Sequence, residues 1–279
     1  MSASSTPSIP FDTLVSRLRT AGCVFAEDEA RLLLDAAANR TELARLLDRR
    51  VSGFPLEQVL GWAEFHGRRI SVAPGVFVPR RRTEFLVRQA LALGREASTA
   101  PVVVDLCCGT GALGAALAAA LPLRELHASD SDPAAVRCAR DNLAAAGGRV
   151  YEGDLYAALP DRLRGRVDIL AANVPYVPSE EVALLPPEAR DHEPRTALDG
   201  GTDGLDVLRR VAAEAPDWLA PGGALLVETG ERQAATAVCL LAESGLLPRV
   251  RVDEEWEASV VLGLRPDGTG RPGSDERPD

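Results

Sequence analysis

The residues best suited to chemistry are Asn173, Val174, Pro175 and Tyr176, which follow a short apolar run at 167–172. Such a run is typical of a buried strand in a parallel sheet, and proline cannot continue a central strand. We therefore expect the chain to leave the sheet here, at the carboxyl edge where open α/β sheets bind their ligands. An amide and an aromatic ring on a stiff turn are poor acid–base catalysts, but they suit the gripping of a flat, uncharged, hydrogen-bonding group. An ordinary strand-ending turn is the structural alternative.

A glycine-rich loop supplies a second candidate site. Residues 109–114 read Gly-Thr-Gly-Ala-Leu-Gly, a GxGxxG pattern between an expected strand at 102–106 and an expected helix at 111–121. Asp130 ends the next expected strand about twenty residues later, where a dinucleotide-binding fold places the acid that binds ribose. Taken alone, this pattern favours a nicotinamide-dependent dehydrogenase.

Three carboxylates change that interpretation. Asp105 ends the first strand, where its charge opposes a pyrophosphate and favours a cation. Asp130 can accept two hydrogen bonds from a ribose diol, and Asp154, at the end of the third expected strand, can accept one from an adenine amino group. S-adenosyl-L-methionine carries a sulfonium, an ammonium, a ribose and an adenine, so it fits all three. Structural roles stay open for Asp105 as a helix cap and for Asp154 as a turn former.

The elements that must position these residues fall into two parts. Helical periodicity over residues 11–62 predicts a small helical domain, and residues 63–80 are typical of an extended hairpin linker. Alternating strands and helices over residues 81–264 predict an α/β domain with a doubly wound, mostly parallel sheet. The polar ends of the chain, 1–10 and 265–279, are expected to be disordered.

Composition and charge narrow the classes of function. The net charge of −10 disfavours binding to phosphate backbones, so we expect no stable nucleic-acid binding. The apolar runs are too short to span a bilayer and residues 1–10 lack a signal pattern, which predicts a soluble, cytoplasmic protein. The sequence contains no lysine, which excludes a catalytic lysine. Its five cysteines show no paired CxxC spacing, so we expect neither a metal site nor a disulfide framework.

These motifs together resemble those of the HemK/PrmC family, the protein-(glutamine-N5) methyltransferases that modify peptide-chain release factors. Residues 78–84 are similar to the family's Pro-Arg…Thr-Glu segment, and Asn-Val-Pro-Tyr at 173–176 is similar to its Asn-Pro-Pro-Tyr signature. Asp105 to Gly111 and Asp130 match its cofactor motifs. Glu193-Pro194, Ala197-Leu198, Gly200-Gly201, Asp203-Gly204-Leu205, Glu228, Gly230 and Gln233 match later segments. The resemblance covers nearly all of residues 55–264.

The resemblance implies a class I S-adenosylmethionine-dependent methyltransferase sheet behind a helical substrate-docking domain, with a release factor as the protein partner. It implies S-adenosyl-L-methionine as the cofactor and no metal. The cofactor-binding residues that we expect are Arg80, Asp105, Cys107, Cys108, Gly109, Thr110, Gly111, Asp130, Asp154, Leu155 and Asn173.

The catalytic residues implied by the resemblance are those at 173–176. The Asn173 side-chain oxygen and the main-chain carbonyl of Val174 would accept both N–H bonds of a glutamine amide, while Tyr176 packs on its flat face. The sequence departs from the family at Val174, where the signature has proline, and at Arg81-Arg82, where the family often has proline and an acid. Two alternatives stay open: a methyltransferase for an adenine or small-molecule amine, and a cofactor-binding protein without catalysis.

Overall fold

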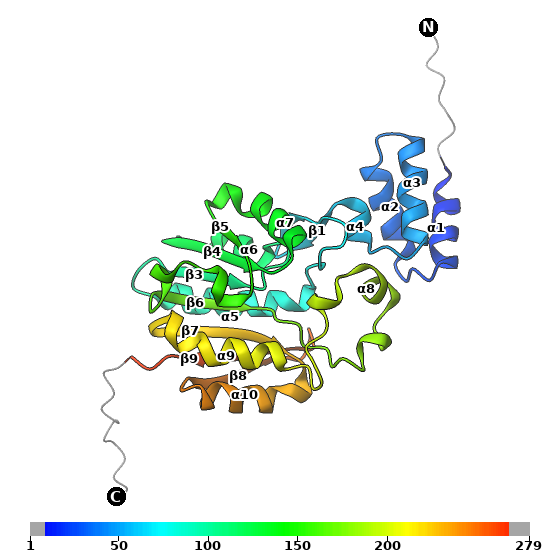
Figure 1. Cartoon of the computed structure of the whole chain (residues 1–279). Coiled ribbons are helices and arrows are strands. Elements are labelled where there is room, and N and C mark those ends of the chain that lie inside the picture. Colours follow the sequence, from blue (N-terminus) through cyan, green and yellow to red (C-terminus); the bar gives the residue numbers. More distant parts are fainter. Residues whose placement is uncertain (1–8, 268–279) are drawn as a thin grey trace, which may run out of the picture.

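The computed structural model describes residues 9–267. The chain forms a small helical bundle and, beside it, a larger sheet with helices on both faces (Figure 1). The disorder predicted for the ends falls mostly on residues 1–8 and 268–279, which lie outside the described residues. Ile9 packs against the core of the bundle, and the Arg265 N–H donates to the Gly223 carbonyl oxygen at 2.8 Å. The fold therefore extends slightly past both predicted boundaries.

The helical bundle buries one apolar face of each of its longer helices. Leu14, Leu18, Leu33 and Leu47 are fully buried in a core of its own. The third helix starts after Asn39, whose side-chain oxygen accepts the Glu42 N–H at 3.0 Å as an N-cap. The four helices are α1 (Phe11–Thr20), α2 (Ala26–Ala36), α3 (Arg40–Val51) and α4 (Leu56–Leu60).

A β-hairpin connects the two parts. Its strands, β1 (Trp62–Phe65) and β2 (Arg68–Ser71), pair antiparallel. His66 and Gly67 close it with φ of 50° and 68°, the paired positive angles of a two-residue type I′ turn. The prediction of a hairpin over 63–80 was therefore too long. Such a tight turn places both strands within ten residues, and no strand forms between residues 72 and 80.

The central sheet has seven strands in the order β5-β4-β3-β6-β7-β9-β8. Only the pairs that involve β9 are antiparallel, which confirms a doubly wound, mostly parallel sheet. All five residues of β3 are buried, because helices cover both faces. The strands are β3 (Val102–Leu106), β4 (Glu125–Asp130), β5 (Arg149–Glu152), β6 (Val167–Ala172), β7 (Leu219–Thr229), β8 (Leu247–Asp253) and β9 (Ala258–Leu264).

Two layers of helices enclose this sheet. One face packs against α5 (Glu84–Glu96), α6 (Ala112–Ala120) and α7 (Pro133–Leu143), and the other against α9 (Asp206–Trp218) and α10 (Ala234–Glu243). Between residues 9 and 267, no helix has both the length and the apolar character that crossing a membrane requires.

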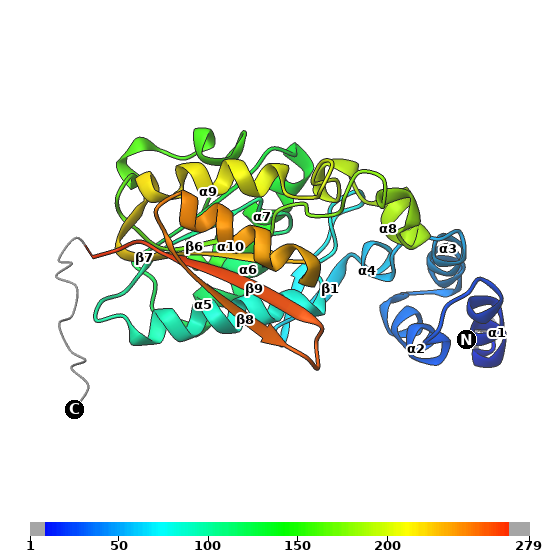
Figure 2. The same ribbon diagram turned by 90° about the horizontal axis from the view of Figure 1, so that it is seen from below.

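The short helix α8 (Pro187–His192) lies outside these layers, against the helical bundle (Figures 1 and 2). The buried Arg50 of α3 binds Glu188 of α8 at 2.7 Å, and the Phe54 and His192 rings stack with centroids 4.1 Å apart. The Gln58 amide adds a hydrogen bond to the His192 carbonyl oxygen at 3.3 Å. These contacts fix the bundle to the large domain.

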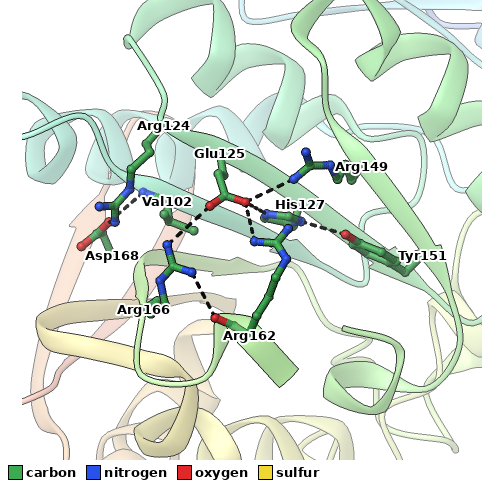
Figure 3. Close-up of polar contacts among 9 residues, drawn as sticks. All are labelled: Val102, Arg124, Glu125, His127, Arg149, Tyr151, Arg162, Arg166 and Asp168. Carbon is green, nitrogen blue, oxygen red and sulfur yellow. Dashed lines mark hydrogen bonds and ion pairs between the residues drawn. The ribbon is translucent and has the colours of Figure 1, made fainter. Parts of the chain in front are cut away.

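At the amino ends of the central strands, one carboxylate forms ion pairs with several arginines (Figure 3). Glu125 Oε2, at the start of β4, accepts from Arg162 at 2.7 Å and from Arg149 at 3.2 Å. It also lies 3.1 Å from Nε2 of the buried His127, whose Nδ1 is 3.1 Å from the Tyr151 hydroxyl. This cluster ties β4 and β5 to the segment before β6, at the edge opposite the predicted site.

Candidate active site

A cavity of about 730 Å³ lies at the carboxyl ends of β3, β4 and β6. The chain winds from β3 outward to β5 and returns to β6 on the other side of β3, so this is the switch point of the sheet. The segments that line the cavity are 77–82, the loop after β3, the ends of β4 and β5, 173–177 and parts of 185–198. Ligand pockets of this size are common in enzymes.

The loop between β3 and α6 turns sharply beside the cavity. Cys107 and Gly109 have φ of 56° and 54°, and a positive φ at the non-glycine Cys107 stores local strain. The Gly109 N–H donates to Asp130 Oδ2 at 2.8 Å, which ties the loop to the end of β4. A Cβ on Gly111 would lie 3.2 Å from Ala139 of α7, so glycine allows the close approach of α7 to the loop.

Asp105 is fully buried beneath this loop. Its Oδ2 accepts the Gly114 N–H of the first turn of α6 at 2.9 Å, so it acts as a cap for that helix. Its Oδ1 has no hydrogen-bond partner in the part of the chain that the structure describes. Burial raises the pKa of this carboxyl to about 8, and the charge of Asp130 adds to the rise. Asp105 does not itself line the cavity.

Asp130 and Asp154 both reach the cavity wall. Asp130 Oδ1 accepts the Asp132 N–H at 2.9 Å, and burial raises the pKa of this carboxyl. Asp154 is exposed and binds Arg210 at 2.5 Å. Leu155, with φ of 46°, is buried and lines the wall beside it. This end of the cavity is therefore rich in carboxylates.

Asn173 follows β6 and faces the cavity, together with Val174 and Pro175. The Asn173 side-chain N–H donates to Thr83 Oγ1 at 3.4 Å, which orients the amide and leaves its oxygen available as an acceptor. Val174 is 2% exposed, and its N–H has no backbone acceptor among the described residues. The substitution of proline by valine in this signature therefore leaves the backbone pairing unchanged.

Tyr176 is held by two side chains from distant segments. Its hydroxyl donates to Oε1 of the buried Glu228 at 3.1 Å and accepts from Arg82, whose Nε lies 3.1 Å from the same carboxylate oxygen. Burial raises the pKa of the Tyr176 phenol, and the charge of Glu228 raises it further. The phenol therefore remains protonated at neutral pH.

Comparison with known proteins shows which family this chain belongs to. The family model of the methyltransferase small domain matches residues 69–184. A release factor glutamine methyltransferase of Geobacter sulfurreducens is 40% identical over 236 residues, covering 83% of this chain and 81% of the relative. The corresponding protein of Deinococcus radiodurans is 37% identical over 276 residues, covering 92% of each chain. The chain belongs to the release factor glutamine methyltransferase family. It is a methyltransferase, and the cofactor of this enzyme class is S-adenosylmethionine.

Another relative carries a different name. A 4-amino-L-phenylalanine/4-methylamino-L-phenylalanine methyltransferase of Streptomyces pristinaespiralis is 40% identical over 201 residues, covering 71% of this chain and 68% of that protein. Among solved structures, a 16S rRNA N2 G1207 methyltransferase of T. thermophilus has a TM-score of 0.53 at 23% identity, covering 73% of this chain and 49% of that one. This likeness confirms the class I methyltransferase fold.

The structure brings most of the predicted site residues of this methyltransferase to one cavity. Those that line it are Arg80, Cys107, Gly109, Asp130, Asp154, Leu155, Asn173, Val174, Pro175 and Tyr176. Asp105, Cys108, Thr110 and Gly111 do not line it. Burial raises the pKa of the Cys107 and Cys108 thiols, so neither is a thiolate nucleophile at neutral pH. No group of His, Cys, Asp and Glu suited to a metal ion occurs among residues 9–267.

Sequence reasoning assigned no role to several residues that shape the site. Thr83 and Glu228 were recognised only as matches to family segments, although one orients Asn173 and the other holds Tyr176. Arg80 binds Glu193 at 2.5 Å, and the Glu193 side chain is fully buried. The segment 185–198, with α8, forms an outer wall of the cavity. Contacts across 52 or more residues give no local signal in the sequence.

Proposed function

We propose that this methyltransferase transfers a methyl group to the side-chain amide nitrogen of a glutamine in a peptide-chain release factor. The observation that carries the proposal is that Asn173 and Tyr176, just after β6, line the same cavity as the carboxylates expected to bind the cofactor. The names of the Geobacter sulfurreducens and Deinococcus radiodurans relatives, at 40% and 37% identity, support this acceptor.

The acceptor chemistry requires positioning more than activation. A carboxamide nitrogen is a weak nucleophile because its lone pair is delocalised into the carbonyl. Two oxygens that accept both of its N–H bonds can fix its orientation and favour pyramidalisation as it attacks. The Asn173 side-chain oxygen and the Val174 carbonyl are the proposed acceptors. Thr83 takes the Asn173 N–H and thereby keeps the amide from turning.

The Tyr176 ring completes the proposed acceptor site. The ring, held by Glu228, packs against the flat face of the acceptor amide. No strong base is needed before transfer, because water can take the proton from the methylated amide afterwards. Correct placement of this kind accounts for up to about 7–11 kcal/mol of a barrier.

The residues at the other end of the cavity fit the cofactor. When bound, S-adenosylmethionine supplies an electrophilic methyl group on a positively charged sulfur. Asp130 and Asp154 present carboxylates suited to a ribose and an adenine, while the turn at Gly109 lets the backbone approach closely. Oδ1 of Asp105, which is buried and has no hydrogen-bond partner among residues 9–267, lies behind the same loop, and a cation bound nearby would favour the ionised carboxylate that burial otherwise disfavours. Arg80 remains the proposed partner of a carboxylate.

The proposed substrate also fixes the proposed partners. The enzyme would bind a release factor, act in the cytoplasm and form no stable complex with nucleic acid, in line with its net charge of −10. The helical bundle, attached to the cavity wall through Arg50 and Glu188, is the proposed docking domain. A helical domain at 11–62, a linker at 63–80 that includes most of the shorter β1–β2 hairpin, and a methyltransferase domain at 81–264 remain the proposed division of the chain.

A second candidate is an aromatic amine on a small amino acid. It is favoured by the Streptomyces pristinaespiralis relative, which is as similar as the release factor enzymes at 40% identity. The departure at Val174 also allows a different acceptor, because the residue differs from the family's proline. An aniline nitrogen, like an amide nitrogen, is flat and carries two N–H bonds for Asn173 and the Val174 carbonyl.

A methyl-transfer assay separates the two candidates. The purified enzyme is supplied with S-adenosylmethionine labelled in the methyl group and with a release factor, 4-amino-L-phenylalanine, or DNA. Label on a release factor glutamine supports the proposal, and label only on the amino acid replaces it with the second candidate. Label only on DNA would contradict both. Cofactor binding by calorimetry without turnover on any acceptor would favour a non-catalytic role.

A further inference from the structure

The short helix α8 is shared between the cavity and the helical bundle (Figures 1 and 2). Glu188 and Ala189 of α8 line the cavity. On the bundle side, Glu188 binds Arg50 of α3 at 2.7 Å, and the His192 ring stacks on Phe54. Because α8 lies outside the two helical layers that cover the sheet, its place depends on these contacts and on the segments at its ends.

Arg50 is at the centre of the contacts between the bundle and α8. Its side chain is 6% exposed, and its Nε and Nη2 donate to the two carboxylate oxygens of Glu29 at 2.6 and 2.9 Å. The remaining nitrogen, Nη1, donates to Glu188 at 2.7 Å and to the Phe54 carbonyl oxygen at 3.0 Å. All three nitrogens of the rigid guanidinium are therefore engaged, which sets the direction in which Glu188 is held.

The segment that follows α8 connects it to both sides of the proposed acceptor site. Glu193 comes directly after α8, and its carboxylate binds Arg80 at 2.5 Å, shortly before Thr83 in the chain. Further along, the Leu198 carbonyl oxygen accepts the Val177 N–H at 3.0 Å, next to the segment 173–176. A displacement of α8 would therefore reach the acceptor site through two separate contacts.

The contact between Arg50 and Glu188 differs from an ordinary surface ion pair. An exposed pair loses entropy because two mobile side chains must be held in one geometry. Here the guanidinium is already fixed by Glu29 inside the bundle, and the Glu188 side chain is 45% exposed. A group fixed in the core of the bundle therefore holds a residue of the cavity wall in place.

We propose that Arg50 is a positioning residue for methyl transfer, which holds α8 where the acceptor amide requires it. The inference rests on the proposed function and deepens it. The bundle that would dock the protein substrate also shapes the wall of the acceptor site, and Glu188 serves as the link between them. The effect on rate is appreciable, because a misplacement of about 1 Å away from the reacting atoms can lower a rate about 100-fold.

The test removes the link without leaving a buried charge in the bundle. Arg50→Met alone would leave Glu29 buried and unpaired, which can unfold the bundle. The double variant Glu29→Leu/Arg50→Met replaces the buried pair by apolar side chains of similar size, so the bundle should stay folded while Glu188 loses its partner. We expect kcat at saturating release factor to fall about tenfold, with the Kd for S-adenosylhomocysteine changed less than about twofold.

The KM-against-kcat split separates positioning from docking. A saturating concentration of release factor compensates for weak docking but not for a misplaced wall. A raised KM with wild-type kcat in Glu29→Leu/Arg50→Met would therefore overturn the inference and leave the proposed function intact. Arg17→Gln is the control, because Arg17 pairs with Asp48 at 2.8 Å on an exposed face of the bundle, and it should keep the wild-type kcat.

A double-mutant cycle shows whether Glu188 acts through Arg50. Glu188→Gln leaves the core of the bundle intact and should lower kcat about threefold to tenfold in the wild-type protein. In Glu29→Leu/Arg50→Met the same substitution should change kcat less than about twofold, because the link is already broken. Effects that multiply would show that Glu188 contacts the substrate independently, and would overturn the inference. Absence of transfer from the wild-type enzyme to a release factor would refute the proposed function itself.

Discussion

At the scale of single residues, the Asn173 side chain is held in one orientation by a hydrogen bond to Thr83. Its amide carries both a donor and an acceptor, and either could face the cavity. Thr83 binds the donor side at 3.4 Å, and Thr83 itself is only 3% exposed, which limits its own rotation. The side-chain oxygen therefore remains available as an acceptor, and the proposed function uses it to accept an N–H bond of the methylated amide. Replacing Thr83 should loosen the orientation of the Asn173 amide without removing its oxygen.

Asn173→Ala should lower kcat by about 100-fold or more, because it removes an oxygen that fixes the attacking nitrogen. The Kd for S-adenosylhomocysteine should change little. Thr83→Val, a nearly isosteric control, should lower kcat by only about tenfold, because the oxygen remains but is less well oriented. Steady-state kinetics and calorimetry measure the two effects, and unimpaired turnover by Asn173→Ala would remove the role given to this residue.

Asp105 should make the stability of the cofactor-free protein depend on pH. Its folded-state pKa is raised from 3.8 to about 8, so the folded state binds a proton between these values that the unfolded state has lost. Stability therefore falls as the pH rises from about 4 to 8. Asp105→Asn keeps the acceptor for the Gly114 N–H and removes this titration.

The Tm of Asp105→Asn should therefore rise relative to that of the wild-type protein between pH 5 and pH 9. Asp161→Asn serves as the control, because the Asp161 side chain is 91% exposed and forms an ion pair with Arg164 on the surface. Thermal unfolding of the three proteins across this pH range measures the difference. A Tm difference that stays constant with pH would show that Asp105 titrates normally.

At the scale of elements, backbone hydrogen bonds to residues 198–200 fix the segment 173–177 that follows β6. The Val177 N–H donates to the Leu198 carbonyl oxygen at 3.0 Å, and the Gly200 N–H donates to the Val177 carbonyl oxygen at 2.8 Å. A Cβ on Gly204 would lie 2.2 Å from the Tyr176 carbonyl oxygen, so only glycine fits there. The Gln233 side chain, which follows β7, also binds this segment, because its Nε2 donates to the Tyr176 carbonyl oxygen at 2.8 Å.

Gln233→Glu should therefore displace the segment 173–176. The Gln233 amide nitrogen also donates to the Asp203 carbonyl oxygen at 2.9 Å, and a carboxylate would repel both carbonyls. We expect kcat to fall by about tenfold to 100-fold, with cofactor affinity unchanged. Arg232→Gln is a matched control, because the Arg232 side chain is 88% exposed. Normal kcat in Gln233→Glu would show that the segment is rigid without this contact.

At the scale of the whole molecule, the two edges of the sheet serve different purposes. The carboxyl edge holds the cavity and the buried carboxylates of Asp105 and Glu228, each with one oxygen that has no hydrogen-bond partner in the described part of the chain. The amino edge holds the Glu125 cluster, in which several cations stabilise one carboxylate (Figure 3). Hydrogen bonds from Arg162, with His127 adding to them, lower the pKa of Glu125 to about 2.

Glu125→Gln should lower the free energy of unfolding by about 1–2 kcal/mol at pH 7, because it leaves several arginines without their shared partner. The folded-state pKa of Glu125 lies below its ordinary value of 4.5, so this stability is present above about pH 4.5 and is lost towards pH 2. Urea unfolding at pH 7 and pH 2.5 should show a large and then a small difference from the wild-type protein. Equal stability at pH 7 would contradict the structural role of the cluster.

Much of this molecule could be predicted from its sequence. The strands of the sheet were recognisable because burial on both faces requires continuous apolar runs, as at 102–106 and 167–172. The extent of the hairpin within 63–80 could not be predicted, since the positive φ at His66 that closes it is a result of the fold and not a propensity of histidine. The pairs Thr83–Asn173 and Arg50–Glu188 join residues 90 and 138 positions apart, so only the fold reveals them.

The most direct test of the account is tandem mass spectrometry of a release factor incubated with the enzyme and methyl-labelled S-adenosylmethionine. The structure-based proposal predicts one added methyl group on the side-chain nitrogen of a single glutamine, absent when Asn173→Ala replaces the wild-type enzyme. A methyl group on any other atom of the release factor, or the same glutamine methylated by Asn173→Ala at the wild-type rate, would contradict it.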